Sequence, residues 1–220
     1  MLYDETAVKA NIRNREGKRV FFLRKEDTLT PSARDFLSRE RIALLPAEQA
    51  KIERYRLLGG GFTEEKPEHM THLYGDVLVE KTHPRIRFRG AVDTLEAELL
   101  LCGPAVGEVL ALARRLIRCD VLDEPVGDVT LYGLTEAQLR QHSHFPQDHY
   151  GIPHFMPDFS DGRELLRLNR ARCAARAAEI AAIEAFSDAD GVLIREDIPR
   201  ALNRVSSMLY ILMIREKAKS

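Results

Sequence analysis

What the sequence lacks excludes several classes of protein. It has no apolar run near the roughly 18 residues that a membrane-spanning helix needs. Its 33 basic and 34 acidic residues give a net charge of −1, which is not the basic footprint of a nucleic-acid-binding protein. The three cysteines, Cys102, Cys119 and Cys173, are scattered and form no C-x-x-C pair, which is typical of free thiols in a reducing compartment. Since the acidic start MLYDET does not resemble a signal peptide, we expect a cytoplasmic protein with no membrane or nucleic-acid partner.

Common nucleotide and nucleophile signatures are missing as well. There is no G-x-x-x-x-G-K-[ST] or G-x-G-x-x-G, so neither a P-loop nor a Rossmann site is expected. No Ser or Cys lies in a nucleophile-elbow context. Four histidines, His142, His144, His149 and His154, instead cluster with prolines and aromatic residues between 142 and 162, which predicts an ordered loop or lid. A His-x-His pair could ligate a metal, but packing of these histidines and aromatic residues on a ligand or on a neighbouring part of the protein is the favoured interpretation.

The composition divides the chain into a small N-terminal part and a larger helical part. Residues 1–58 contain a helix with Thr30 as its cap and Pro31 in its first turn. The triple glycine at 59–61 indicates a hinge. Helical patterns then occur at about 85–102, 104–121, 135–141, 165–186 and 198–217. We predict a mainly α protein, with a helical bundle in residues 66–220 and a small α/β appendage in residues 1–58.

The helix predicted at 165–186 carries charge along one face. Asp161 and Glu164 predict a cap at its start. Residues spaced by three or four share a face of a helix. The stripe formed in this way contains Leu165, Leu168, Arg172, Arg176, Glu179, Ile183 and Phe186. Because burying a charge is costly unless it is paired, two interpretations are open. The face is half buried with solvated or bridged charges, or it lines an inward-facing site that suits a triphosphate.

Three stretches, taken together, resemble a known family. They are K-x-H-P-R-I-x-F-R-G-x-V-D at 81–93, R-x-x-x-R-x-x-E at 172–179 and L-N-R-V-S-S-x-L-Y at 202–210. In order and spacing they are similar to the ATP:cob(I)alamin adenosyltransferases, best to the ethanolamine-utilization type and more distantly to the PduO type. LTPSARDFL at 29–37 and GIPHF at 151–155 also resemble the ethanolamine-utilization branch. The resemblance covers most of the chain and implies a five-helix bundle that assembles as a homotrimer, with ATP and cobalamin bound between subunits.

The resemblance also implies the reaction and the residues that hold ATP. Cob(I)alamin would attack the 5′ carbon of ATP, giving adenosylcobalamin and triphosphate, with Mg²⁺ serving the ATP. By matching positions, Arg176 would contact the polyphosphate and Glu179 would lie nearer the ribose. Lys81 would hold phosphate, and Asn203 would bind the nucleotide. Because the cofactor supplies the nucleophile, the protein needs to position carbon 5′, exclude water and neutralise the leaving triphosphate.

Further expected roles concern the subunit interface and the corrin. Arg172 and Asp93 match a family salt bridge between subunits, and with Arg176 they form the expected catalytic group. Phe155 or Met156 would cover the lower corrin face, with His154 beside them, where the family removes the axial ligand of cobalt.

Departures from the family pattern leave alternatives open. Only Tyr74-Gly75-Asp76 stands where the PduO type has a Thr-Gly-Asp-x-Gly phosphate loop, which favours a non-catalytic cobalamin carrier or sensor of the same fold. The His-x11-Cys-Cys-x2-Cys segment of some ethanolamine-utilization members has no counterpart before Cys102, so no structural metal is expected. A metalloenzyme with a histidine lid is a third hypothesis. The resemblance further implies a cobalamin reductase and ethanolamine ammonia-lyase or microcompartment proteins as partners.

Overall fold

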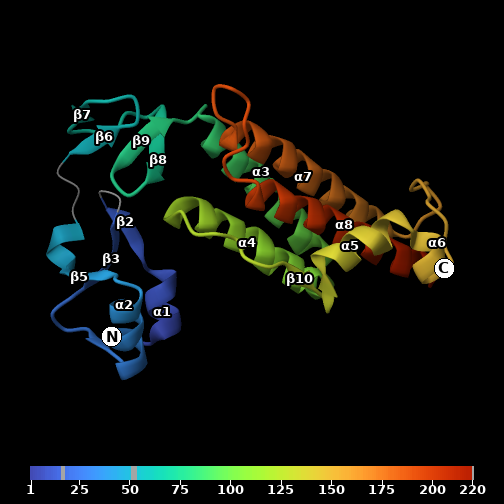
Figure 1. The fold of residues 1–220 in the computed structure, drawn as a ribbon, viewed down its shortest axis with the longest axis horizontal. Coiled ribbons are helices and arrows are strands. Elements are labelled where there is room, and N and C mark those ends of the chain that lie inside the picture. The colour runs from blue at the N-terminus through green and yellow to red at the C-terminus, as the bar shows by residue number, and fades with distance from the viewer. Residues whose placement is uncertain (16–17, 51–53, 220) are drawn as a thin grey trace. The chain divides into compact units, whose positions relative to one another are not determined.

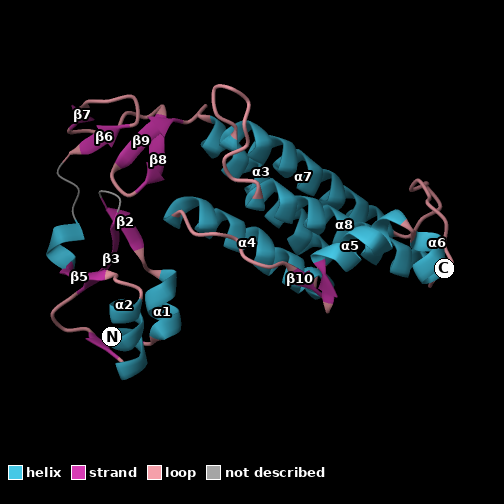
Figure 2. Cartoon of the chain, in the orientation of Figure 1, coloured by secondary structure: helices cyan, strands magenta, loops and turns pink. Residues whose placement is uncertain are grey.

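The computed structural model describes residues 1–15, 18–50 and 54–219. The chain forms two compact units, Met1–His83 and Pro84–Ser220 (Figure 1). Most strands belong to the first unit, and long helices make up the second (Figure 2). The expected mainly α fold, a helical bundle with a small α/β appendage, is therefore confirmed. The compact units divide after His83, whereas the sequence placed the change between residues 58 and 66, and the assignment of domains stays a prediction.

The first unit contains short strands and two helices. Its strands are β1 (Leu2–Tyr3), β2 (Arg13–Arg15), β3 (Lys18–Leu23), β4 (Thr28–Leu29), β5 (Ala43–Pro46), β6 (Tyr55–Leu57), β7 (Phe62–Thr63), β8 (Met70–Tyr74) and β9 (Val77–Glu80). Its helices are α1 (Glu5–Ala10), α2 (Pro31–Arg39) and the 3-10 turn η1 (Ala47–Ala50). Strand β3 pairs antiparallel with β2 and, across α2, parallel with β5. The Thr30 hydroxyl accepts from the Ala33 amide at 3.3 Å, which confirms the predicted cap of α2.

The expected hinge at the triple glycine is wrong. Gly60 and Gly61 have φ values of +103° and +86° and form the turn that joins β6 to β7. Positive φ is a conformation that glycine adopts without strain, so the glycines serve a hairpin. β6 then joins the sheet of order β7-β6-β9-β8, which the sequence had not indicated. The β8–β9 pairing has a register irregularity between His72 and Tyr74, and such an interruption weakens the alternation by which strands are recognised.

The second unit is the helical bundle. Its elements are α3 (Pro84–Cys102), the 3-10 turn η2 (Pro104–Val106), α4 (Gly107–Leu122), β10 (Thr130–Leu131), β11 (Leu134–Thr135), α5 (Glu136–His144), α6 (Pro146–Tyr150), α7 (Arg163–Phe186) and α8 (Asp197–Lys217). Helices α3, α4, α7 and α8 run alongside one another, while α5 and α6 pack on α8 (Figure 1). No helix in the described part of the chain has the length and hydropathy that a membrane crossing requires.

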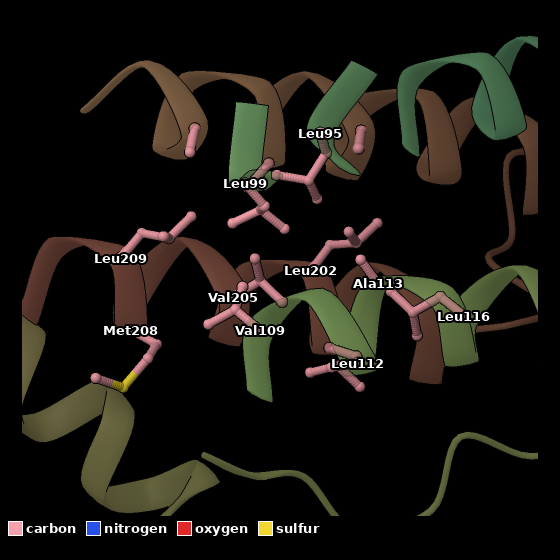
Figure 3. Close-up of a cluster of buried hydrophobic side chains, with 14 of the residues drawn as sticks. Leu95, Leu99, Val109, Leu112, Ala113, Leu116, Leu202, Val205, Met208 and Leu209 are labelled. Carbon is pink, nitrogen blue, oxygen red and sulfur yellow. The ribbon is translucent and has the colours of Figure 1, made fainter. Parts of the chain in front are cut away.

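Leucine and valine side chains from three helices meet in the core of the bundle. Leu95 and Leu99 of α3 point toward Leu202 and Val205 of α8, and α4 contributes Leu116 from the opposite side (Figure 3). All of these side chains are fully buried, and each such burial stabilises the fold by roughly 1.5–3 kcal/mol. Helix α8 is therefore central to the bundle, and its buried residues lie on more than one side of the helix.

The buried face of α7 differs from the predicted stripe. Between its apolar ends, the core side is formed by Ala171, Ala175, Ala178 and Ala182, all fully buried. Arg172, Arg176 and Glu179 each directly follow one of these alanines, so they lie at the border of the buried face. Because alanine side chains are small, they let neighbouring helices approach closely, and the row of alanines is the one that packs into the core. The predicted Asp161–Glu164 cap is also wrong, because the N-cap is Gly162 with no side-chain bond, while Asp161 pairs with Lys217.

A buried ion network joins α3 to α4. The Asp120 carboxylate is fully buried and accepts from Arg85 Nε at 2.7 Å and from Arg89 Nε at 2.6 Å. The two guanidinium groups offset the free energy that desolvation of the Asp120 carboxylate costs. This buried charge is therefore paired, as burial of a charge requires.

The segment expected to be one long loop contains helices. His142 and His144 belong to the last turn of α5, and α6 follows directly. In this segment Phe145, which separates the two helices, and residues 151–162 lack regular structure, apart from turns and bends. Pro146 begins α6 and Gly151, with φ +67°, ends it, so proline and glycine bound a helix here rather than excluding one.

Candidate functional site

A cleft of about 390 Å³ opens in the helical unit between α5, α7, α8 and residues 151–162. Its volume is in the range of small-molecule sites. α7 contributes Arg172 and Arg176 to its wall, and α8 contributes Asn203 and Tyr210. The cleft therefore has cationic, amide and aromatic groups along its helical wall. A second hollow, of about 280 Å³, lies over the β6–β7 hairpin of the other unit.

The α7 wall carries two guanidinium groups one helical turn apart. Arg172 is half buried, and its guanidinium donates to Asn169 Oδ1 at 3.2 and 3.4 Å and lies 5.8 Å from the centre of the Tyr210 ring. Arg176 is exposed to the cleft and makes no hydrogen bond or ion pair with any described residue. Both cations thus line the cleft without a carboxylate partner in the described part of the chain. An anionic ligand would supply the missing charge.

Glu179 and Asn203 form a polar contact between α7 and α8. The Asn203 amide nitrogen donates to Glu179 Oε1 at 3.0 Å, and its amide oxygen accepts from Arg204 at 2.9 Å. Both side chains of the α7–α8 contact are half buried. Because Glu179 can only accept and Arg204 can only donate, the two partners together set which way the Asn203 amide points.

Arg204 is an unusual cation in this part of the bundle. Its Nε atom is buried and has no hydrogen-bond partner among the described residues. Burial lowers the pKa of the Arg204 guanidinium below its ordinary value. An unsatisfied buried donor costs roughly 1–3 kcal/mol, so this side chain does not serve stability alone.

The wall facing the arginines is aromatic. Phe155 is half buried, and its ring centre lies 5.9 Å from that of Tyr210, while the Lys217 ammonium is 5.7 Å from the Phe155 ring. His154 stacks on Tyr210 at 5.7 Å. Met156 is 89% exposed and does not line the cleft. Of the two positions left open by the sequence, the structure therefore places Phe155 in the cleft wall.

The other histidines of this region form a separate cluster. His142 and His149 stack with their ring centres 3.8 Å apart, and the Tyr150 hydroxyl lies 2.8 Å from His142 Nδ1. Burial, followed by the nearby His149 and Arg215, lowers the pKa of His142. Stacked rings do not direct their nitrogens at a common point, and in the described ranges no three His, Cys, Asp or Glu side chains gather as metal ligands.

Four of the predicted site residues, Met156, Glu179, Asp93 and Lys81, do not line the cleft. Asp93 is exposed on α3, and its carboxylate makes no hydrogen bond or ion pair in the described ranges. Lys81 belongs to the N-terminal unit, where its ammonium is 3.6 Å from the Glu68 carboxylate. In the same unit Asp76, which stands in the comparable place to the missing phosphate loop, is held by Arg56 through bonds of 2.8 and 3.0 Å.

Sequence reasoning missed part of the cleft wall. Ser206, Ser207 and Tyr210 follow Asn203 at helical spacings of three, four and seven, so α8 directs all of them toward the cleft. That spacing was the available signal. Ser143 and His144 at the end of α5 also line the cleft, but nothing local in the sequence distinguishes them.

The chain is similar to known proteins over most of its length. The model of the cobalamin adenosyltransferase family matches residues 61–122 and 153–216. The chain is 30% identical over 246 residues to the corrinoid adenosyltransferase EutT of Salmonella typhimurium strain LT2, covering 98% of this chain and 92% of that protein. It is 33% identical over 158 residues to the corrinoid adenosyltransferase EutT of Escherichia coli K12, and this match spans 68% of the chain but only 59% of that relative. The two family segments contain the α7 and α8 residues of the cleft, whereas Ser143 and His144 lie between them.

Proposed function

Because this chain belongs to the cobalamin adenosyltransferase family, we propose that it transfers the 5′-deoxyadenosyl group of ATP to cob(I)alamin. The Co(I) electron pair forms the bond to carbon 5′ of the ribose. The bond from carbon 5′ to oxygen breaks, and its electron pair leaves with triphosphate. Adenosylcobalamin and triphosphate are the products, so no protein base is needed to activate the nucleophile.

The observation that carries this proposal is the unpaired charge of the cleft. Arg172 and Arg176 lie one turn apart on α7, and no carboxylate of the described chain balances them. A polyphosphate has the charge and the acceptor oxygens to do so. As the carbon–oxygen bond breaks, the triphosphate gains negative charge, and fixed guanidinium groups stabilise it most at that moment.

We assign the nucleotide contacts as follows. Arg176 binds the polyphosphate, and Glu179 lies nearer the ribose. Asn203 donates to the nucleotide through the amide hydrogen that Glu179 does not use. Lys81, from the N-terminal unit, holds phosphate. Mg²⁺ accompanies the ATP and needs no site built from protein groups alone.

We assign the corrinoid to the aromatic side of the cleft. The cleft volume suits a nucleotide, and a corrinoid is several times larger, so the corrin ring would lie across the mouth of the cleft. Phe155 would present its ring to the lower corrin face, with His154 behind it. Met156, which extends into solvent, would reach the corrin from the same segment.

We further propose a homotrimer in which the site is completed between subunits. Asp93 is exposed without a partner in the described chain, and the only polar partner of Arg172 there is an amide. A salt bridge between Asp93 of one copy and Arg172 of the next would satisfy both. Sedimentation of the protein at several concentrations tests the assembly, and loss of the trimer in Asp93→Asn would support the assigned bridge.

For the biological setting, we propose a cytoplasmic role in ethanolamine utilization, in line with the sequence resemblance. A cobalamin reductase would supply the electron that produces Co(I), and ethanolamine ammonia-lyase would use the product. Association with a bacterial microcompartment would bring these proteins together.

Incubation of the protein with ATP, Mg²⁺ and chemically reduced cobalamin under anaerobic conditions tests the proposed activity. Formation of the light-sensitive carbon–cobalt bond, followed by absorbance, together with one triphosphate per corrinoid supports it. Corrinoid binding without turnover would favour the carrier or sensor. Activity that a chelator abolishes, and that Mg²⁺ does not restore, would favour the metalloenzyme with a histidine lid.

A further inference from the structure

His154 ties residues 151–162 to two helices at once. Its Nδ1 atom lies 3.0 Å from the Tyr210 hydroxyl on α8, and its Nε2 atom lies 3.1 Å from the backbone carbonyl oxygen of His144 at the end of α5. The rings of His154 and Tyr210 are nearly parallel, with an angle of 11° between their planes. One side chain therefore connects three elements of the cleft wall.

The direction of these hydrogen bonds follows from their partners. A backbone carbonyl oxygen can only accept, so His154 Nε2 must carry a hydrogen and donate it to His144. In the neutral imidazole the other nitrogen is then an acceptor, and the Tyr210 hydroxyl donates to it. The His144 carbonyl at the end of α5 thus sets the tautomer of His154. The tautomer of His154 in turn sets the orientation of the Tyr210 hydroxyl on α8.

Tyr210 lies between the arginine side of the cleft and its aromatic side. The Arg172 guanidinium is 5.8 Å from its ring centre, and the Phe155 ring is 5.9 Å away at an angle of 31°. Phe155 directly follows His154 in the chain, so wherever His154 is held, Phe155 is held as well. The position of the aromatic wall thus depends on the bond between His154 and Tyr210.

We propose that His154 and Tyr210 are a positioning pair, whose hydrogen bond holds residues 151–162 against α8 so that the Phe155 ring is presented to the corrinoid. Neither residue contacts the reacting carbon or cobalt. The inference rests on the proposed adenosyl transfer and assigns to His154 an indirect role. The nucleotide contacts of Arg176 and Asn203 do not depend on this bond.

Two variants separate the bonds of His154. Tyr210→Phe removes only the hydroxyl. His154→Gln can place its amide nitrogen near the position of Nε2, as a donor to the His144 carbonyl, but has no atom at the position of Nδ1 to accept from Tyr210. The double variant tests whether both changes remove the same interaction. Tyr150→Phe is the matched control, because it removes a hydroxyl that bonds to His142 at 2.8 Å but does not line the cleft.

The first measurement is steady-state kinetics with reduced cobalamin. We expect each single variant to raise KM for the corrinoid about tenfold, the loss of one hydrogen bond, with KM for ATP changed less than twofold. The double variant should have a KM for the corrinoid no higher than that of the more impaired single variant. The control should have the KM values of the wild type. Equal increases in both KM values, or no increase in either, would overturn the proposal.

The second measurement needs no substrate. Chymotrypsin cleaves after aromatic residues, and Phe155 and Phe159 lie in the held segment. We expect cleavage there to be several times faster in Tyr210→Phe and His154→Gln than in the wild type or Tyr150→Phe. Unchanged cleavage in an active enzyme would overturn the positioning pair alone. A wild-type protein without transferase activity would overturn the proposed function and, with it, the corrinoid role of the pair.

Discussion

Replacement of Arg176 by methionine should separate catalysis from stability more cleanly than any other change in the cleft. Arg176 is exposed and makes no hydrogen bond or ion pair with the described residues, so the fold loses no interaction of its own. Methionine is a helix former of similar propensity and length. We expect the midpoint of thermal unfolding to change by no more than about 2 °C.

The effect on activity should be much larger. Under the proposed reaction, Arg176 stabilises charge on the departing triphosphate, and the loss of one such donor lowers a rate about 100-fold or more. At 25 °C a factor of 100 corresponds to about 2.7 kcal/mol of transition-state stabilisation. Because the charge grows as the bond breaks, kcat should fall, and KM for ATP should rise less.

The assay is anaerobic formation of adenosylcobalamin at varied ATP, alongside thermal unfolding of the same preparation. Arg167→Met is the control, since Arg167 lies on the same helix and, among the described residues, pairs only with the exposed Glu164, at 3.0 Å. It should retain wild-type kinetics. If Arg176→Met kept kcat within threefold of the wild type, the assignment of polyphosphate to this wall would be wrong. A large loss of stability would instead show that Arg176 supports the fold through more than its own contacts.

Three further changes test the physical account of the bundle. Asp120→Ala leaves two half-buried guanidinium groups without their carboxylate and should lower the free energy of unfolding by about 3 kcal/mol, the lower end for a broken buried pair, measured by denaturant titration. Arg204→Met removes an unsatisfied buried donor but also the bond to the Asn203 amide oxygen, so the two effects oppose each other and the free energy of unfolding should change by no more than about 1 kcal/mol; a loss above 3 kcal/mol would contradict this account. Burial lowers the pKa of His142 in the folded protein below its ordinary value of 6.5. As the pH falls through about 6.5, His142 therefore becomes protonated in the unfolded chain before it does so in the folded protein, and the free energy of unfolding should decrease. Thermal scans across pH should show a weaker decline in His142→Gln, and identical profiles would refute the assignment.

Local signals in the sequence accounted for most of the helical elements. Thr30 caps α2 as expected, and Thr135 caps α5 in the same way, because a cap depends only on residues within one turn. The periodic apolar residues of α3, α4 and α8 likewise marked helices whose buried sides pack together in one core. The cluster of Arg172, Arg176 and Glu179 is recognisable from its helical spacing alone.

Strands and turns were less predictable. The sheet formed by β6 to β9 depends on pairing between segments that are individually only two to five residues long. The triple glycine is locally compatible with either a hinge or a hairpin, and only the pairing of β6 with β7 decides between them. Helix α6, bounded by proline and glycine, was missed because both residues also mark loops.

The amino-acid sequence by itself determined that charged residues would follow one another along a single stripe of α7, because helical periodicity is a local property of the chain. Only the tertiary structure decided that alanines fill the core row and that the charges border a cleft, since burial depends on the approach of α3 and α8. The same holds for the pair of His154 and Tyr210, which are 56 positions apart and share no local pattern. Their hydrogen bond exists because packing of α5, α8 and the segment 151–162 brings the two rings together.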